Sequence, residues 1–168
     1  MISNPICFSR PVAAAQSLGS AALDAHRFVD KSMVLIVDGA FAATRNGAVM
    51  LESCLLLLPR ICKKVYVQVN KPVRNTNREC QRMIKEIGLP GIEVISSSGH
   101  LGHADAILVL GHVPIKGINC TVANCNGWLA RIGNDVELEQ VCDQFNPIGA
   151  FAAACLATAE IFKKLVVV

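Results

Sequence analysis

The chain has 168 residues, which is close to the usual size of one domain and leaves no room for a second full one. Hydrophobic residues make up 52% of it and charged residues only 17%, which excludes a disordered chain and indicates a fold whose surface is largely covered. The formal net charge is +3 at pH 7. We therefore expect a single domain over residues 1–168, part of whose surface is covered by a partner subunit or a further domain.

The composition also bears on where the protein resides. Apolar runs such as Met33–Val37 are far shorter than the about 20 residues that cross a bilayer. The first residues, Met1–Pro11, lack the continuous apolar segment of a secretion signal. Eight cysteines are scattered through apolar segments, a distribution typical of reduced, buried thiols. We expect a cytoplasmic protein that does not span a membrane.

The first half of the chain alternates between helix and strand patterns. Apolar residues at three- and four-residue steps predict helices, and continuous β-branched runs predict strands that are buried on both faces. In chain order these are a helix over Val12–Val29, a strand over Met33–Val37, a helix over Ala48–Leu58, a strand over Val65–Val69 and a helix over Arg78–Ile87 closed by Gly88.

The second half of the chain adds strands to the parallel sheet and then changes to an antiparallel pattern. Gly91–Ile95 and Ala106–Leu110 predict two more strands, and the alternating order of strands and helices implies a parallel sheet. Ile118–Ala123 and Trp128–Ile132 predict an antiparallel hairpin, because an Asn-Gly turn signal lies between them. After a polar segment, Gly149–Leu165 predicts a closing helix. The fold class is therefore α/β: a Rossmann-like, mainly parallel sheet flanked by helices, with a C-terminal hairpin and closing helix.

Ligands of open α/β sheets bind beyond the carboxyl ends of the strands, which directs attention to Asp38, Asn70, Gly111 and Asn124. The dinucleotide fingerprint is absent there, because the turn after the first strand has Gly39 alone where the motif needs three glycines. A nicotinamide oxidoreductase therefore ranks last among the functions considered. Asp38 and Gly39 remain candidates for cofactor binding, and the alternative is that Gly39 only lets the strand turn into a helix.

A basic loop follows the second strand. Asn70–Arg78 gathers cationic and amide side chains, including Arg74 and Asn77, just past a strand and at the start of a helix. Such a loop can hold a triphosphate, and the alternative is a solvated basic loop. The single Tyr and single Trp both lie outside this loop, so stacking platforms for a nucleic acid are not supported.

Metal and thiol chemistry receive weaker support. His100 and His103 are spaced as His-x-x-His and could join Cys120 and Cys125 in a zinc site, but the Cys-x4-Cys spacing is atypical, so no zinc or other metal is expected. His100 could also serve as a general base, although no nucleophile is paired with it by spacing. Cys125, on the predicted hairpin turn, is expected to be the most exposed thiol and is the candidate for thioester chemistry; the alternative is an incidental turn cysteine.

Two C-terminal segments, Asn124–Ile132 and Asn146–Lys163, together carry a family resemblance. They resemble the ThiF-like family of ubiquitin-like-protein activating enzymes, as found in bacterial proteins, and the second segment is similar to that family's closing helix. Asn75–Glu79 is similar to the family segment whose arginine meets the phosphates of ATP. The resemblance thus implies that Arg78 binds phosphate and that Asn70 stands where the family has a ribose-binding aspartate.

The resemblance further implies an activity and its partners. An active member adenylates the C-terminus of a ubiquitin-like or sulfur-carrier protein with ATP and Mg²⁺. Because this chain lacks the glycine-rich loop and an evident acidic Mg²⁺ ligand, it is similar to the inactive, fold-equivalent halves that lend dimer contacts, either as a homo-oligomer or beside an active adenylation domain in a longer protein. The alternative is a module that binds a nucleotide or other small molecule for regulation, without catalysis.

Overall fold

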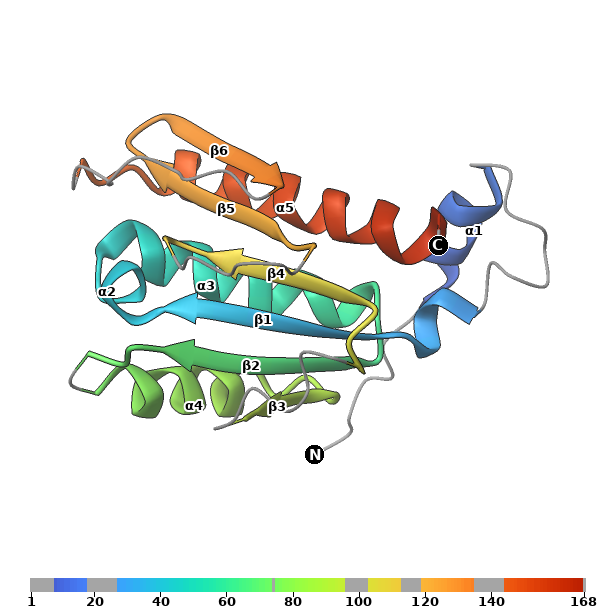
Figure 1. Cartoon of the computed structure of the whole chain (residues 1–168), viewed down its shortest axis with the longest axis horizontal. Helices are drawn as coiled ribbons and strands as arrows, with labels where there is room; N and C mark the ends of the chain where they lie inside the picture. The colour runs from blue at the N-terminus through green and yellow to red at the C-terminus, as the bar shows by residue number, and fades with distance from the viewer. Residues whose placement is uncertain are drawn as a thin grey trace.

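The computed structural model describes residues 8–17, 27–73, 75–95, 103–112, 119–134 and 144–167. It is built on a six-stranded sheet in the order β3-β2-β1-β4-β5-β6 (Figure 1). The strands are β1 (Ser32–Asp38), β2 (Lys64–Asn70), β3 (Ile92–Val94), β4 (Ala106–Leu110), β5 (Thr121–Asn126) and β6 (Leu129–Asn134). Neighbouring strands run parallel, except that β5 and β6 form an antiparallel hairpin. This is the Rossmann strand order, and the predicted fold class is confirmed.

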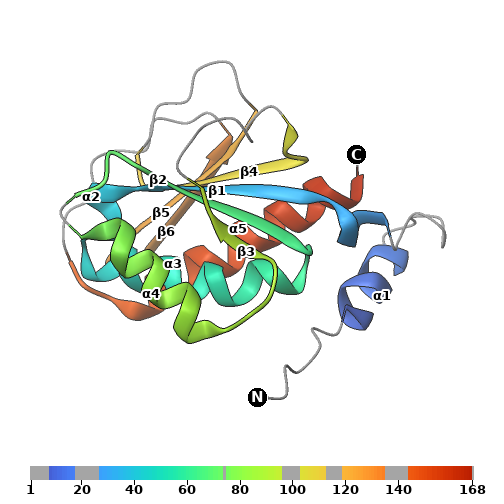
Figure 2. The same cartoon turned by 90° about the horizontal axis from the view of Figure 1, so that it is seen from below.

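The longer helices that pack on the sheet cover one face of it (Figure 2). They are α3 (Arg45–Leu57), α4 (Thr76–Ile87) and α5 (Pro147–Val167), while α1 (Ser9–Ser17) lies at the end of the sheet near the C-terminal end of α5. Short helical turns complete the described elements: η1 (Arg27–Asp30), α2 (Gly39–Ala42) and η2 (Leu58–Arg60).

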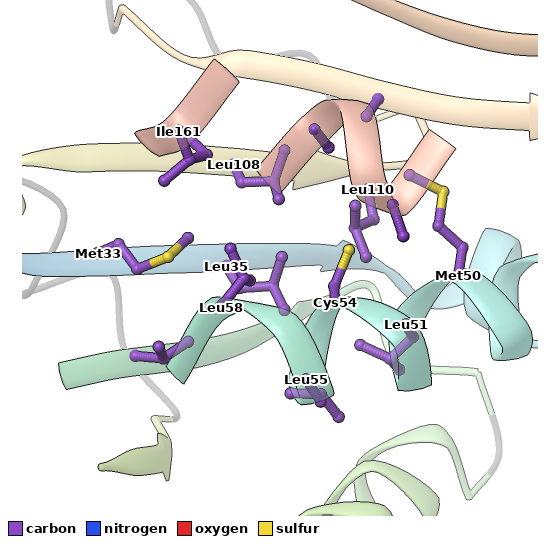
Figure 3. Close-up of a cluster of buried hydrophobic side chains, with 14 of the residues drawn as sticks. Met33, Leu35, Met50, Leu51, Cys54, Leu55, Leu58, Leu108, Leu110 and Ile161 are labelled. Carbon is purple, nitrogen blue, oxygen red and sulfur yellow. The ribbon is translucent and has the colours of Figure 1, made fainter. Parts of the chain in front are cut away.

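The main core lies between the sheet and these helices. Alternate side chains of β1, such as Met33 and Leu35, meet Leu108 of β4 and the inner faces of α3 and α5 (Figure 3). Small residues dominate the inner face of α5, where Ala150, Ala153, Ala154 and Ala157 are fully buried and let the helix approach the sheet closely. The other face of the sheet carries a smaller buried cluster: Val34, Ile36, Ile107, Val109, Cys120 and Val122.

Most of the predicted elements are present with shifted ends. Helix α4 ends as expected at Gly88, which has a φ of 62° and donates its N–H to Ile84. The first predicted helix, over Val12–Val29, is only partly correct: α1 ends at Ser17, residues 18–26 lie outside the described residues, and 27–30 form the 3-10 turn η1.

The hairpin is present, but its turn is displaced from the predicted position. Asn126 pairs with Leu129, so Gly127 and Trp128 make a two-residue turn. Gly127 has a φ of 53°, and a glycine at the first central position is the pattern of a type II′ turn. The prediction that Asn124 and Cys125 belong to the turn, and Trp128 to a strand, is therefore wrong. Most of the polar segment that was expected before α5 lies outside the described residues.

Candidate functional site

The strand order reverses between β1 and β4, and this is where a doubly wound sheet opens a crevice for ligands. Val37 pairs with Leu110, so Asp38 and Gly111 follow side by side at the carboxyl edge of the sheet. On the other side of β1, Asp38 pairs with Asn70, the last residue of β2. The structure thus brings together three of the positions that the sequence singled out, Asp38, Asn70 and Gly111.

The Asp38 carboxylate is used for internal hydrogen bonds across this edge. Its Oδ1 accepts a hydrogen bond from the N–H of Ala40 at 3.0 Å, which makes Asp38 the N-cap of α2. Its Oδ2 accepts one from the N–H of His112 at 3.2 Å, on the β4 side of the strand reversal. Because a bound phosphate would need the N–H groups at the start of a helix, a carboxylate that already accepts from one of them opposes an anionic ligand.

Gly39 is needed at this edge because the chain packs against itself there. A Cβ atom on Gly39 would lie 2.4 Å from the carbonyl oxygen of Lys71 and 3.0 Å from the Cα of Pro72. The segment after β2 therefore covers the turn after β1. The backbone of that segment leaves no room for a side chain at position 39, so this glycine serves internal packing.

The β4 side of the same edge is filled in a similar way. A Cβ atom on Gly111 would lie 2.6 Å from the Cβ of Phe41 and 2.7 Å from the Cβ of Asp38. Phe41 itself is 5% exposed, so its side chain is part of the core. The side chain of Phe41, from α2, thus fills the point of strand reversal.

The predicted phosphate-binding residues of α4 follow, along the chain, the segment that packs against Gly39. Asn77 and Arg78 are exposed in the first turn of α4. The residue before that helix, Asn75, has a φ of 76° and makes no side-chain cap hydrogen bond. Arg74 lies outside the described residues. The structure therefore groups Asp38, Gly39 and Asn70 at the sheet edge and presents Arg78 to solvent.

Cys125 is not exposed, which contradicts the sequence-based prediction. It lies in β5 with its side chain in the main core, fully buried. This burial raises the pKa of its thiol to about 11, so the nucleophilic thiolate is disfavoured at neutral pH. Among the described cysteines, the exposed one is Cys155, on α5.

The sulfur atoms proposed for zinc face opposite sides of the sheet. Cys120 belongs to the cluster on the face opposite the described helices α3, α4 and α5, whereas Cys125 belongs to the main core. One ion cannot bind both. His103 is exposed and His100 lies outside the described residues. In the part of the chain that is described, no three His, Cys, Asp or Glu side chains gather in a way that could hold a metal ion.

Sequence reasoning missed a buried amide that connects three distant elements. Asn46, in the first turn of α3, is fully buried; its Nδ2 donates to the Gln144 carbonyl at 2.8 Å, and its Oδ1 accepts from the Asn146 N–H at 2.9 Å. The same Gln144 carbonyl accepts from the N–H of Gly127 at 2.9 Å. The signal was available, because Asn46 shares a helix face with the core residue Met50 at a four-residue step.

The surroundings of this amide hold the hairpin turn against the start of α5. A Cβ atom on Gly149 would lie 2.0 Å from the carbonyl oxygen of Gly127, so the turn and the helix are in backbone contact. The guanidinium of Arg45 lies 3.8 Å from the ring centroid of Phe145 and adds a cation–π contact beside it. We refer to Asn46, Gly127, Gln144, Asn146 and Gly149 as the α5 clamp.

Comparison with known proteins gives one family. Residues 32–167 match the BilD N-terminal domain family, and because this match covers most of the chain, the chain belongs to that family. No curated protein matches the sequence. Within the described residues, none of the helices is both long enough and apolar enough to cross a membrane.

Proposed function

We propose that this member of the BilD N-terminal domain family is a ThiF-like domain of an adenylation system for a ubiquitin-like or sulfur-carrier protein. Its role is that of a scaffold and dimer half that has lost ATP chemistry. The Rossmann strand order and the family-like closing helix support the relationship. The description of the family as an N-terminal domain supports pairing with a further, adenylating domain.

One observation carries the loss of ATP chemistry. In the turn after β1, where a Rossmann domain receives phosphates, the carbonyl oxygen of Lys71 packs against Gly39, and the N–H of Ala40 donates to the Asp38 carboxylate. Both features place negative charge or partial charge where a triphosphate would need donors. The protein would have to move backbone, and not only a flexible side chain, to admit ATP in the usual place.

The cell compartment follows from the thiols. Six cysteines in the described part of the chain are free, and five of these are buried. Free, buried thiols are typical of proteins that fold under reducing conditions. We therefore place the domain in the cytoplasm, together with its carrier protein and its adenylating partner.

The proposal is tested with ATP and Mg²⁺ on the purified chain. Isothermal titration should show no saturable binding up to millimolar ATP, and exchange of labelled pyrophosphate into ATP should stay at background. Arg78→Ala should leave both measurements unchanged. Micromolar ATP binding together with pyrophosphate exchange, both lost in Arg78→Ala, would instead identify an active adenylating domain in which Arg78 meets the phosphates and Mg²⁺ is the companion ion.

A second candidate function, a regulatory module for a small polar ligand, is favoured by two side chains of β5. Asn124 is 1% exposed, and among the described residues its Nδ2 has no hydrogen-bond partner. Oδ1 of Asn126, on the same face of the strand, likewise has no hydrogen-bond partner among these residues. Buried amides of this kind usually have a partner. Binding of free nucleotides without exchange, lost in Asn124→Ala, would support this function over the first.

A further inference from the structure

Helix α5 is apolar on its outer face as well as on its inner face. On the outer face, Ile148 is 60% exposed, Phe151 is 54% exposed and Leu156 is 52% exposed. No Asp, Glu, Lys or Arg occurs between Gln144 and Ala159. This N-terminal part of α5 is apolar all round, and such a helix is normally buried all round, yet these three side chains stay more than half exposed in the described part of the chain.

The hairpin turn extends this apolar surface. Trp128 is 75% exposed, and its backbone lies against the first turn of α5, because a Cβ atom on Gly149 would come within 3.3 Å of the Trp128 carbonyl carbon. We call the surface made by Trp128, Ile148, Phe151 and Leu156 the α5 face. It contains four of the eight large hydrophobic residues that are exposed in the described part of the chain.

The exposed apolar area of the α5 face is about the apolar area that one partner contributes to a stable dimer. Scaling the exposed fractions by about 150–250 Å² for each large side chain gives roughly 360–600 Å² of apolar surface for the four residues. A standard interface buries about 800 Å² on each partner, of which a little over half is apolar. The four side chains therefore supply about the whole apolar area that one partner contributes.

The charge pattern of the α5 face suits a second copy of the same chain. In a two-fold interface each copy presents the same patch, so any charged residue near the axis meets its own like charge. The uncharged stretch from Gln144 to Ala159 avoids that repulsion, although the whole chain carries a net charge of +3. On this face, between Phe151 and Leu156, Ala152 and Cys155 are small enough to let a second helix approach closely.

The α5 clamp holds this surface in place before a partner binds. Asn46 fixes the chain at Gln144 and Asn146 immediately before the helix, and Gly127 fixes the turn through the same Gln144 carbonyl. A surface that is already ordered loses little conformational entropy on association.

We propose that the α5 face binds the α5 face of a second copy of the chain, so that two α5 helices pack across a two-fold axis. This goes beyond the proposed function, because it holds whether or not the chain also serves an adenylating partner. It also names the residues of the interface.

The test measures the mass of the chain in solution by sedimentation velocity from about 1 to 100 μM. The wild type should reach twice the chain mass of 18.0 kDa, and Phe151→Glu should raise the dissociation constant at least tenfold. Phe151 is exposed and lies outside the core, so this variant should keep the circular dichroism and the melting temperature of the wild type. Leu56→Glu is the matched control, since Leu56 is an exposed apolar residue on α3, outside the α5 face.

Trp128 provides an independent readout, because it is the only tryptophan in the chain. Its emission should shift to shorter wavelength with rising concentration in the wild type and in Leu56→Glu, and stay constant in Phe151→Glu. A chain that remains monomeric at 100 μM overturns the proposal, and so does a dimer that Phe151→Glu leaves intact. Neither result alters the ATP titration, so failure of this inference is distinguishable from failure of the proposed function.

Discussion

Asn46 offers the sharpest test of how the fold is held together at the start of α5. Asn46→Ala removes two hydrogen bonds, at 2.8 and 2.9 Å, which join α3 to residues 98 and 100 positions away. At about 1 kcal/mol for each bond, with a further penalty for the unpaired Asn146 N–H, the free energy of unfolding should fall by about 2–3 kcal/mol. For a domain of this size, about 2–4 °C per kcal/mol converts this loss into a drop of roughly 4–12 °C in melting temperature.

Urea unfolding followed by circular dichroism measures this loss directly. Ser53→Ala is the matched control, because Ser53 is also buried in α3 but donates only to the Val49 carbonyl in its own helix; it should lose less than about 1 kcal/mol. Asn46→Asp retains the acceptor for Asn146 and loses the donor to Gln144. It should be less stable at pH 7 than at pH 4, relative to the wild type, since only a protonated carboxyl can donate. An Asn46→Ala loss no larger than that of Ser53→Ala would refute the role of the clamp.

Three further outcomes follow from the same structure. Gly149→Ala should lower the free energy of unfolding in urea by more than about 2 kcal/mol, because its Cβ would meet the Gly127 carbonyl oxygen at 2.0 Å. Since alanine is the better helix former, a gain in stability would contradict this contact. Burial raises the pKa of Cys125 to about 11, so this thiol should resist iodoacetamide at pH 8 until the protein unfolds, whereas the exposed Cys155 reacts in dilute native protein. Peptide mass spectrometry measures both reactions, and early labelling of Cys125 would show that it is accessible. Asp38→Ala should cost about 1–2 kcal/mol in urea through loss of the α2 cap, without creating ATP binding in a titration; ATP binding by this variant would show that the carboxylate alone excludes phosphate.

The strands could be predicted where burial on both faces makes the sequence pattern unambiguous. Met33–Val37 and Ala106–Leu110 are continuous apolar runs because both faces of β1 and β4 are covered, and such runs identify a strand without knowledge of its neighbours. The turn after α4 was predictable as well, since Gly88 supplies a positive φ that other residues adopt at a cost.

The hairpin shows why the position of a turn is harder to predict than its presence. The Asn-Gly signal correctly predicted a turn, but the pairing of β5 with β4 determines which residues of β5 face the core. Leu110 pairs with Ala123, which places Cys125 on the same buried face as Ala123 and leaves Trp128 in the turn. Because side chains alternate along a strand, a small shift of the turn exchanged a surface thiol for a core thiol.

The state of the candidate site could not be predicted, because it depends on a contact between segments far apart in the chain. Gly39 satisfies one position of a phosphate-binding turn, yet the carbonyl oxygen of Lys71 packs directly against it. The path that residues 71–73 take after β2 decides whether backbone packs against this turn, and their sequence alone indicates an open basic loop. The same limitation concealed Asn46, whose partners lie about 100 positions further along the chain.

A fingerprint counts glycines, whereas the physical requirement behind it is empty space and free N–H donors beside a helix start. Replacing Phe41 with glycine would complete the first Gly-x-Gly of the motif, but the Lys71 carbonyl would still pack against Gly39 and the Asp38 carboxylate would still accept from Ala40. We therefore expect an ATP titration of Phe41→Gly to remain flat. Saturable binding would mean that this side chain, and not the backbone after β2, excludes the nucleotide, and it would remove the main support for an inactive half.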